Sequence, residues 1–161
     1  MITVRPERVE DQAETQNVIA AATATLRQTY RPKQNAIENK ARISPGLQRL
    51  VAVAGGRVVG TVQYYLEGQS VRVICLSVHT DYRQKGGARS LIRHLEKIGI
   101  GEKTTQLKLH TVRETGNVNI FKRLGFTVVA EREDDLFESD RFEKLTDVEM
   151  ILHLLKSENS L

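Results

Sequence analysis

Residues 71–98 constrain the fold of this chain more than any other stretch, because they combine an apolar strand, a glycine turn and an amphipathic helix. In VRVICLSV, apolar residues lie on both alternating faces, which is typical of a strand covered on both sides at the centre of a sheet. After the turn, apolar residues recur at positions 88, 91, 92, 95 and 98, the spacing of one helix face. The stretch therefore predicts a central strand that leads straight into a helix.

The joint between this strand and helix has the chemistry of an anion site. The first N–H groups of a helix are unpaired, and they lie at the positive end of its dipole. Gly86 and Gly87 carry no side chain, so a phosphate or pyrophosphate can approach those N–H groups. Arg83, Lys85 and Arg89 add positive charge around the turn. A tight structural connection with solvated basic residues remains the alternative, because a short glycine motif alone is weak evidence.

Two named phosphate-binding motifs do not fit this turn. A Walker loop requires Gly-Lys followed by Ser or Thr, which is absent after Gly86 and Gly87. The dinucleotide fingerprint G-x-G-x-x-G requires a third glycine at fixed spacing, which is also absent.

The turn instead resembles the acetyl-CoA signature of the GNAT N-acetyltransferases, [RQ]-x-x-G-x-[GA] after a central strand. Arg83-Gln84-Lys85-Gly86-Gly87-Ala88 matches each constrained position. Further along, the segment NVNIFKRLGF at 117–126 resembles the family's helix that closes in Gly-Phe. Both motifs occur in the family's order and separation, and the resemblance covers roughly residues 50–152.

The resemblance implies a mixed α/β (α+β) fold with a twisted central sheet of about seven strands and helices on both faces. The strands ending at Val78 and Val112 are expected to run parallel and then part, so that the pantetheine arm lies between them. Periodicity and turn signals predict strands over 2–5, 50–54, 58–66, 71–78, 105–112, 126–131 and 145–152, helices over 11–26, 33–42, 88–98 and 114–124, a charged loop over 133–144 and a frayed tail from Lys156.

Composition favours one domain over residues 1–161 and excludes several classes of protein. A net charge of +4, with no interleaving of aromatic and basic residues, does not favour a nucleic-acid partner. No apolar run approaches the 18 residues of a membrane span, and no apolar segment typical of a secretion signal opens the chain. Cys75, the only cysteine, is predicted to be a small buried hydrophobe, and its isolation suggests a reducing cytoplasm. No metal site is predicted.

The resemblance assigns acetyl-CoA as co-substrate and gives each motif a role. The backbone of Leu76, Ser77 and Val78 would pair with pantetheine amides, as an added strand does. The turn and first helical residues would cradle the pyrophosphate, and two residues of the later helix would line the far wall. The turn residues are Arg83, Gln84, Lys85, Gly86, Gly87, Ala88, Arg89 and Ser90, and the wall residues are Asn117 and Phe121.

Acetyl transfer also needs a base for the acceptor amine, polarisation of the thioester and an acid for the leaving thiolate. His79, His110 and Glu114 are the candidates for base or acid, and Ser77 is a candidate to polarise the thioester. Each of these residues also has an ordinary structural explanation. Many members of the family carry a tyrosine acid where this chain has Phe121, which has no proton to give.

The sequence contains conflicting hints about the acceptor. The basic segment with Arg27, Tyr30, Arg31 and Lys33 suggests a carboxylate or phosphate on the acceptor, whereas the acidic residues of segment 133–140 suggest a cationic acceptor. Solvated surface charge explains either group equally well.

The leading hypothesis is an N-acetyltransferase that acts on a primary amine of a small molecule or peptide. Transfer is expected to be direct, in a ternary complex, because no credible nucleophile is present. The main alternative is a non-catalytic acyl-CoA-binding or regulatory module, motivated by Phe121. A nucleotide-binding module that uses the same turn is a further alternative. Separately, the family resemblance suggests that the protein forms a homodimer.

Overall fold

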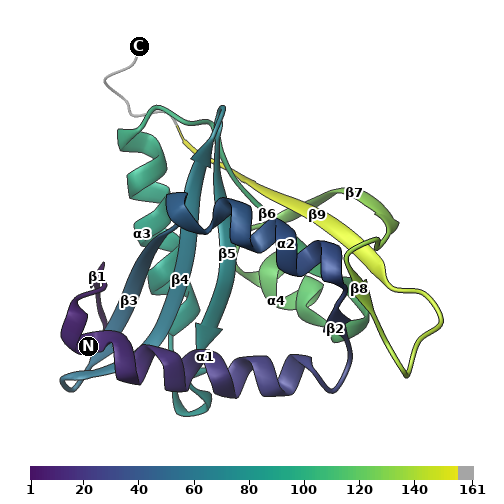
Figure 1. Ribbon diagram of the computed structural model, residues 1–161. Helices are drawn as coiled ribbons and strands as arrows, with labels where there is room; N and C mark the ends of the chain where they lie inside the picture. The colour runs from purple at the N-terminus through teal and green to yellow at the C-terminus, as the bar shows by residue number, and fades with distance from the viewer. Residues whose placement is uncertain (156–161) are drawn as a thin grey trace.

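A mixed sheet of seven strands forms the centre of the computed structural model, which describes residues 1–155 (Figure 1). Its strands, in spatial order, are β1 (Thr3–Pro6), β3 (Gln48–Ala54), β4 (Arg57–Glu67), β5 (Ser70–Val78), β6 (Gln106–Val112), β9 (Thr146–His153) and β7 (Thr127–Glu133). Only β5 and β6 pair in parallel, and all other neighbours are antiparallel. The predicted mixed α/β sheet is confirmed, while the predicted tail from Lys156 lies outside the described residues.

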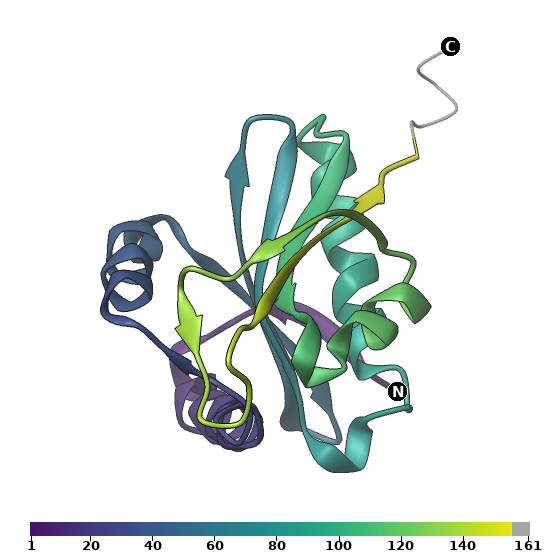
Figure 2. The same ribbon diagram turned by 90° about the vertical axis from the view of Figure 1, so that its right-hand side faces the viewer.

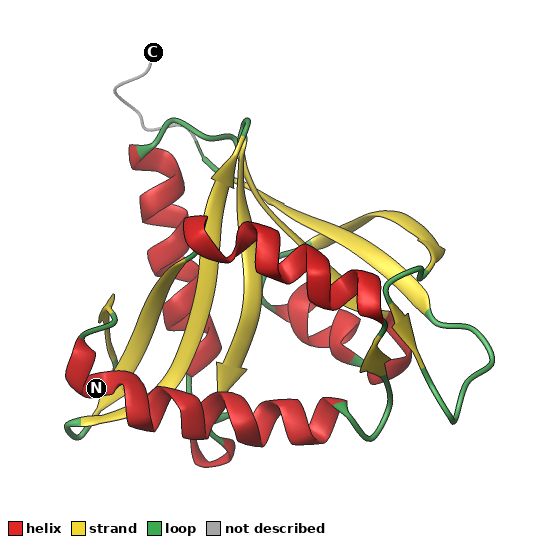
Figure 3. Cartoon of the chain, in the orientation of Figure 1, coloured by secondary structure: helices red, strands yellow, loops and turns green. Residues whose placement is uncertain are grey.

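Helices cover both faces of the sheet, as predicted (Figures 2 and 3). On one face lie α1 (Gln12–Leu26) and α2 (Gln34–Ile43), and on the other lie α3 (Gly87–Gly101) and α4 (Asn117–Arg123). The main core lies between the sheet and α3, whose residues Leu91, Ile92 and Leu95 are at most 1% exposed. By contrast, α2 has no buried residue and stands further from the sheet than α1 does (Figure 2).

The helix after the glycine turn is longer than predicted. The sequence predicts a helix over 88–98, but α3 continues through Gly99 to Gly101. Gly99 is buried, and a Cβ there would lie 2.6 Å from Cδ1 of Leu154 and 2.9 Å from Oγ1 of Thr104. This glycine therefore permits a close approach of two segments and does not end the helix.

Two predicted segments near the C-terminal half also differ from the structure. The region expected to be helical over 114–124 is a 3-10 turn over Arg113–Thr115 followed by α4. The segment expected to be a loop over 133–144 contains β8 (Phe137–Glu138), which pairs with β2 (Arg31–Pro32). Both differences arise because short elements carry little periodicity, and because the partner of β8 lies far away in sequence.

Candidate functional site

The strands β5 and β6 pair over only three positions and then separate. Ser70, Val71 and Arg72 pair with Gln106, Leu107 and Lys108, whereas β5 continues to Val78 and β6 to Val112 without further pairing between them. Their ribbons diverge toward the end of β5 in Figure 1. The predicted parallel strands that part are confirmed. Beyond Arg72, the β6-facing backbone groups of β5 are left for another extended partner.

A β-bulge interrupts β5 inside this unpaired stretch. Thr61 pairs with Ser77 and Gln63 with Ile74, so Val62 alone lies opposite both Cys75 and Leu76. Cys75 adopts a left-handed φ of 53° and is exposed. The prediction that Cys75 is a buried hydrophobe is therefore wrong, because the bulge breaks the alternation on which that prediction depended.

The glycine turn before α3 has the backbone of an anion cradle. Gln84 and Gly86 have φ values of 64° and 89°, and α3 starts at Gly87. A Cβ on Gly87 would lie 3.0 Å from Cγ1 of Val78, whereas a Cβ on Gly86 would meet open space. Gly87 thus lets the helix approach the end of β5, while Gly86 leaves the first N–H groups of the helix open to a ligand.

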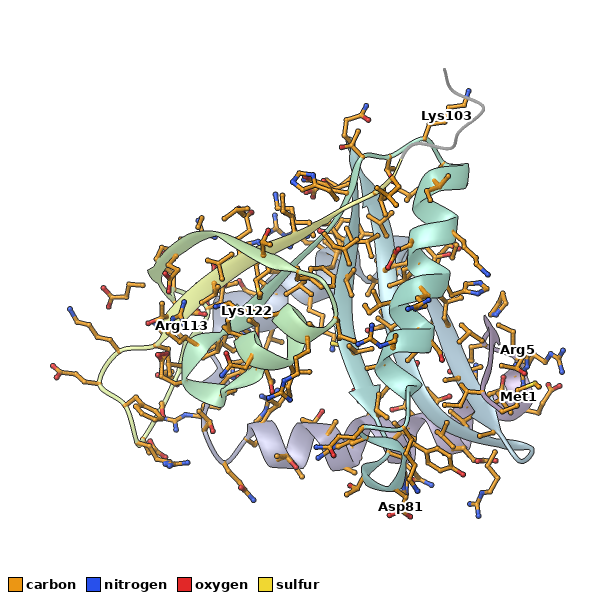
Figure 4. All side chains as sticks on the ribbon, turned by 180° about the vertical axis from the view of Figure 1, so that it is seen from behind. Met1, Arg5, Asp81, Lys103, Arg113 and Lys122 are labelled. Carbon is orange, nitrogen blue, oxygen red and sulfur yellow. The ribbon has the colours of Figure 1, made fainter. Side chains whose placement is uncertain are left out.

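Cationic side chains surround the turn. Nε of Arg83 donates to the carbonyl of Val78 at 3.3 Å, and the ammonium of Lys85 lies 6.0 Å from the ring centre of Tyr82. A guanidinium nitrogen of Arg89 donates to the carbonyl of Arg123 at 3.2 Å, which joins the start of α3 to the end of α4. Seen from behind, α3 rises from the turn that carries Asp81, with α4 beside it (Figure 4).

The predicted wall residues lie on α4. Asn117 is the first residue of the helix, and Phe121 lies one turn further along. The rings of Phe121 and Phe126 meet edge to face with centres 5.9 Å apart, and Phe121 packs against the main core. The structure thus gives Phe121 a packing role, and it brings α4 close to the turn through the contact between Arg89 and Arg123.

The two histidine candidates differ in the way their rings are held. Nδ1 of His79 accepts the backbone N–H of Asp81 at 3.1 Å, so the neutral ring carries its proton on Nε2. Both nitrogens of neutral His79 are therefore committed, and neither is free to accept a proton from a substrate. Nδ1 of His110 lies 3.0 Å and 3.1 Å from the two carboxylate oxygens of Asp147, with Nε2 3.5 Å from Glu149.

The other two candidates are engaged in the scaffold. Oε1 of Glu114 accepts the backbone N–H of Thr146 at 2.5 Å, which fixes the start of β9. Ser77 is buried and pairs with Thr61 of β4 across the strands. The contact of Glu114 gives that residue a structural function, and Ser77 is enclosed in the sheet.

The surroundings of His110 include two acids that the sequence analysis did not single out. Burial alone would raise the pKa of Asp147, but the hydrogen bond and charge of His110, together with Arg132, hold it below its ordinary value. A small cavity of about 80 Å³ lies among His110, Asp147, Glu149 and Arg132. The alternation of acidic and apolar residues along TDVEM was the signal that could have revealed this polar face.

The basic and acidic segments behind the conflicting acceptor hints contact each other through Arg31 and the backbone of Lys33. Arg31 of β2 binds Glu138 at 3.2 Å and Asp140 at 2.8 Å, and the N–H of Lys33 donates to the carbonyl of Leu136. Arg31 is therefore a partner of the acidic loop before β9. Its charge carries little information about an acceptor.

A larger cavity of about 360 Å³ lies between α3 and the end of β9, over Ile92, Leu124 and Leu152, and it borders the turn through Arg89. Within residues 1–155, no group of three or more His, Cys, Asp or Glu side chains is arranged to hold a metal ion. No helix in the same part of the chain has the length and apolar character needed to cross a membrane.

This fold and turn define a class of protein, and comparison with known proteins identifies it. Residues 11–126 match the model of the acetyltransferase (GNAT) family. The chain therefore belongs to the GNAT family. An acetyltransferase from Yersinia pestis is 35% identical over 92 residues, which are 56% of this chain and 64% of that relative.

Solved structures share the fold at low sequence identity. An aminoglycoside 6'-N-acetyltransferase complexed with coenzyme A has a TM-score of 0.71 at 13% identity, over 96% of this chain and 98% of that chain. A Bacillus subtilis acetyltransferase in complex with CoA has a TM-score of 0.69 at 13% identity, over 96% and 100%. The ribosomal-protein-S18-alanine N-acetyltransferase of Escherichia coli has a TM-score of 0.68 at 14% identity, over 100% and 99%.

Proposed function

We propose that this protein transfers an acetyl group from acetyl-CoA to a primary amine. The observation that carries the proposal is the union of two features, the unpaired edge of β5 beyond Arg72 and the glycine turn at the start of α3. A pantetheine arm has amides that suit the first, and a pyrophosphate suits the second. Family membership and the CoA complexes of two structural neighbours support the same ligand.

In this proposal the cofactor extends from the turn along β5. The N–H groups at the start of α3 receive the pyrophosphate, with Arg83, Lys85 and Arg89 around it. The backbone of Leu76, Ser77 and Val78 pairs with the pantetheine amides. The bulge then brings the thioester to the place where β5 has left β6, and a bulge N–H there polarises the carbonyl.

Transfer is proposed to be direct, with cofactor and acceptor bound together. The amine nitrogen attacks the thioester carbon, a C–N bond forms, the C–S bond breaks and the thiolate leaves. Because Cys75 is exposed at the bulge, a covalent acetyl-cysteine route needs its own test. We expect Cys75→Ala to retain transfer within about threefold, and we expect mass spectrometry to find no acetylated enzyme after incubation with acetyl-CoA alone. A stable acetyl adduct on Cys75 that the acceptor discharges would replace direct transfer.

The decisive experiment is calorimetric titration of acetyl-CoA into the wild type and Gly86→Asp. The new carboxylate would repel the pyrophosphate, so we expect micromolar binding, about 8 kcal/mol at 1 μM, to disappear in the variant. Gly68→Asp is the matched control, because Gly68 also has a positive φ, 58°, and open space around its Cβ, but lies in the turn between β4 and β5. Absence of binding by the wild type, or equal loss in both variants, would overturn the cofactor site.

A non-catalytic acyl-CoA-binding module is the second candidate. It is favoured by Phe121, which packs on Phe126 and offers no proton to the thiolate. A screen of primary amines for release of free thiol separates the two functions, because the module would bind acetyl-CoA without turnover. Displacement of acetyl-CoA by ATP from a shared site would instead favour a nucleotide-binding module.

A further inference from the structure

The face of the sheet opposite α3 and α4 carries a chain of charged contacts. Alternate residues of β6 and β9, such as Leu109 and Met150, enter the core, so their neighbours project from the other face. There the ammonium of Lys108 lies 3.1 Å from Oε1 of Glu149, and that oxygen lies 3.5 Å from Nε2 of His110. Asp147 then joins Nδ1 of His110 to Nε of Arg132, at 3.0 Å and 3.2 Å.

The pairing of His110 with Asp147 decides which ring nitrogen carries the proton. A carboxylate can only accept hydrogen bonds, so Nδ1 of His110 is the donor. In the neutral ring the lone pair is then on Nε2, so Nε2 and Oε1 of Glu149, 3.5 Å apart, are both acceptors and suit a donor shared between them. His79 has the reverse arrangement, because its Nδ1 accepts an N–H and its proton is on Nε2. Of these two histidines, His110 is the one oriented as a base.

His110 also lies at the opening between β5 and β6. Arg72 and Lys108 form the last pair of these strands, and His110 is two residues beyond Lys108 on the same face of β6. The bulge at Cys75 is three residues beyond Arg72 on β5. His110 on β6 and the bulge on β5, where the thioester is proposed to lie, are therefore on opposite sides of the same opening.

We propose that His110 removes the proton of the acceptor ammonium, that Asp147 is its positioning residue, and that Glu149 holds the ammonium. The acceptor is thus an aliphatic primary amine that arrives as a cation. This inference rests on the proposed acetyl transfer. Nε2 takes one proton from R–NH₃⁺, the neutral nitrogen attacks the thioester carbon, and the second proton goes to the departing thiolate. His110 returns its proton to solvent, so the products are an amide, free CoA and one proton.

The charged groups around His110 explain why an ammonium is the fitting ligand. From β9 it faces the carboxylates of Asp147 and Glu149. Asp147 is also paired with Arg132 of β7, and Glu149 with Lys108 of β6. Lys108 already places an ammonium 3.1 Å from Oε1 of Glu149, so in this proposal an acceptor ammonium would displace Lys108 from that oxygen or share it. The small cavity among these residues has room for the amine end of a chain.

The first test requires no turnover. ¹⁵N NMR of histidine-labelled protein reports the ring tautomer, and we expect the proton of His110 on Nδ1 and that of His79 on Nε2. Asp147→Asn should change the His110 tautomer populations and leave His79 unchanged. A His110 ring protonated on Nε2 in the neutral wild type would overturn the inference. Calorimetric titration with acetyl-CoA separates the two possible failures. If acetyl-CoA binds but the tautomer is wrong, the role of His110 fails while the cofactor site stands.

The second test compares amines that do and do not need a base. With n-butylamine at pH 7, His110→Gln should lower kcat/KM by about 10²- to 10⁴-fold, whereas methoxyamine, already neutral at that pH, should lose far less. Glu149→Gln should raise KM for n-butylamine, and Asp147→Asn should lower kcat. His153→Gln, on the far end of β9, is the control and should match the wild type. Equal losses for both amines in His110→Gln, or no loss, would overturn the role of His110 as base.

Discussion

At the scale of single residues, side chains of the same type have different roles that depend on their hydrogen-bond partners. His79 follows β5 and His110 lies on β6, the two strands beside the opening. His79 caps a turn, whereas His110 is held by the carboxylate of Asp147. Asp11 shows a similar dependence on partners. Its carboxylate accepts hydrogen bonds from Nη1 and Nη2 of Arg5, at 2.6 Å and 3.0 Å, and from the backbone N–H of Arg8 at 2.7 Å.

The ion pair of Asp11 predicts a pH-dependent stability. The hydrogen bonds from Arg5 lower the pKa of Asp11 from 3.8 to about 2, against the opposing effect of burial. Because the folded pKa is the lower one, the stabilisation is present above about pH 4 and is lost as the pH falls toward 2. Asp11→Asn should therefore unfold in less urea at pH 6, with a loss of about 1 kcal/mol after allowance for the solvent exposure of Arg5.

The control for this measurement is Glu10→Gln, which changes the exposed neighbouring acid. The difference between Asp11→Asn and the wild type should shrink as the pH approaches 2. A difference that stays constant from pH 6 to pH 2 would show that charge pairing is not the cause.

At the scale of elements, α3 joins the core to the site. Its apolar stripe fixes it against the sheet, and its first turn carries the proposed anion site. Glycines near its two ends have different roles, since Gly87 and Gly99 permit close packing whereas Gly101 has open space around its Cβ. Such differences cannot be seen in the composition of the helix.

The two glycines at the end of α3 predict opposite effects of alanine. Gly99→Ala would force a methyl group to within 3.3 Å of Cγ2 of Val71 and still closer to Leu154 and Thr104. We expect a loss of about 1–3 kcal/mol in the free energy of unfolding from overpacking. Gly101→Ala should be neutral or stabilising by up to about 1 kcal/mol, because it reduces the entropy of the unfolded chain. Urea denaturation of both variants tests the pair, and equal effects would contradict the packing role of Gly99.

At the scale of the whole molecule, one hydrophobic core extends across the boundary between β5 and β6, where the sheet opens. The main cluster includes Leu50 and Val73 on one side of that boundary, and Leu107 and Met150 on the other. Parallel pairing of β5 with β6 contributes only three positions. The side chains of the core, more than the strand pairing, therefore hold the two parts of the sheet together.

This shared core predicts a single cooperative thermal transition in calorimetry. Acetyl-CoA at 100 times its dissociation constant should add about 2.7 kcal/mol to the free energy of unfolding, because it binds only the folded protein. The resulting rise in Tm should be absent in Gly86→Asp and present in Gly68→Asp. Two separate transitions in the unliganded protein would contradict a common core.

The sequence by itself determined the order of most elements, the central strand, and the turn with its glycines and cations. These features are local, because periodicity and turn chemistry depend on residues a few positions apart. From them the central strand, the helix after it and a candidate anion-binding turn could be predicted before any coordinates. The mixed sheet and the acetyl-CoA site were instead implied by the resemblance to the GNAT family.

Only the tertiary structure decided the bulge at Cys75, the mutual pairing of Arg31 with Glu138 and Asp140, and the contact of His110 with Asp147. Arg31 and Glu138 are 107 positions apart, and His110 and Asp147 are 37 apart. Whether a charge is free to meet a ligand depends on the partner that folding brings to it, and no local pattern in the chain encodes that partner.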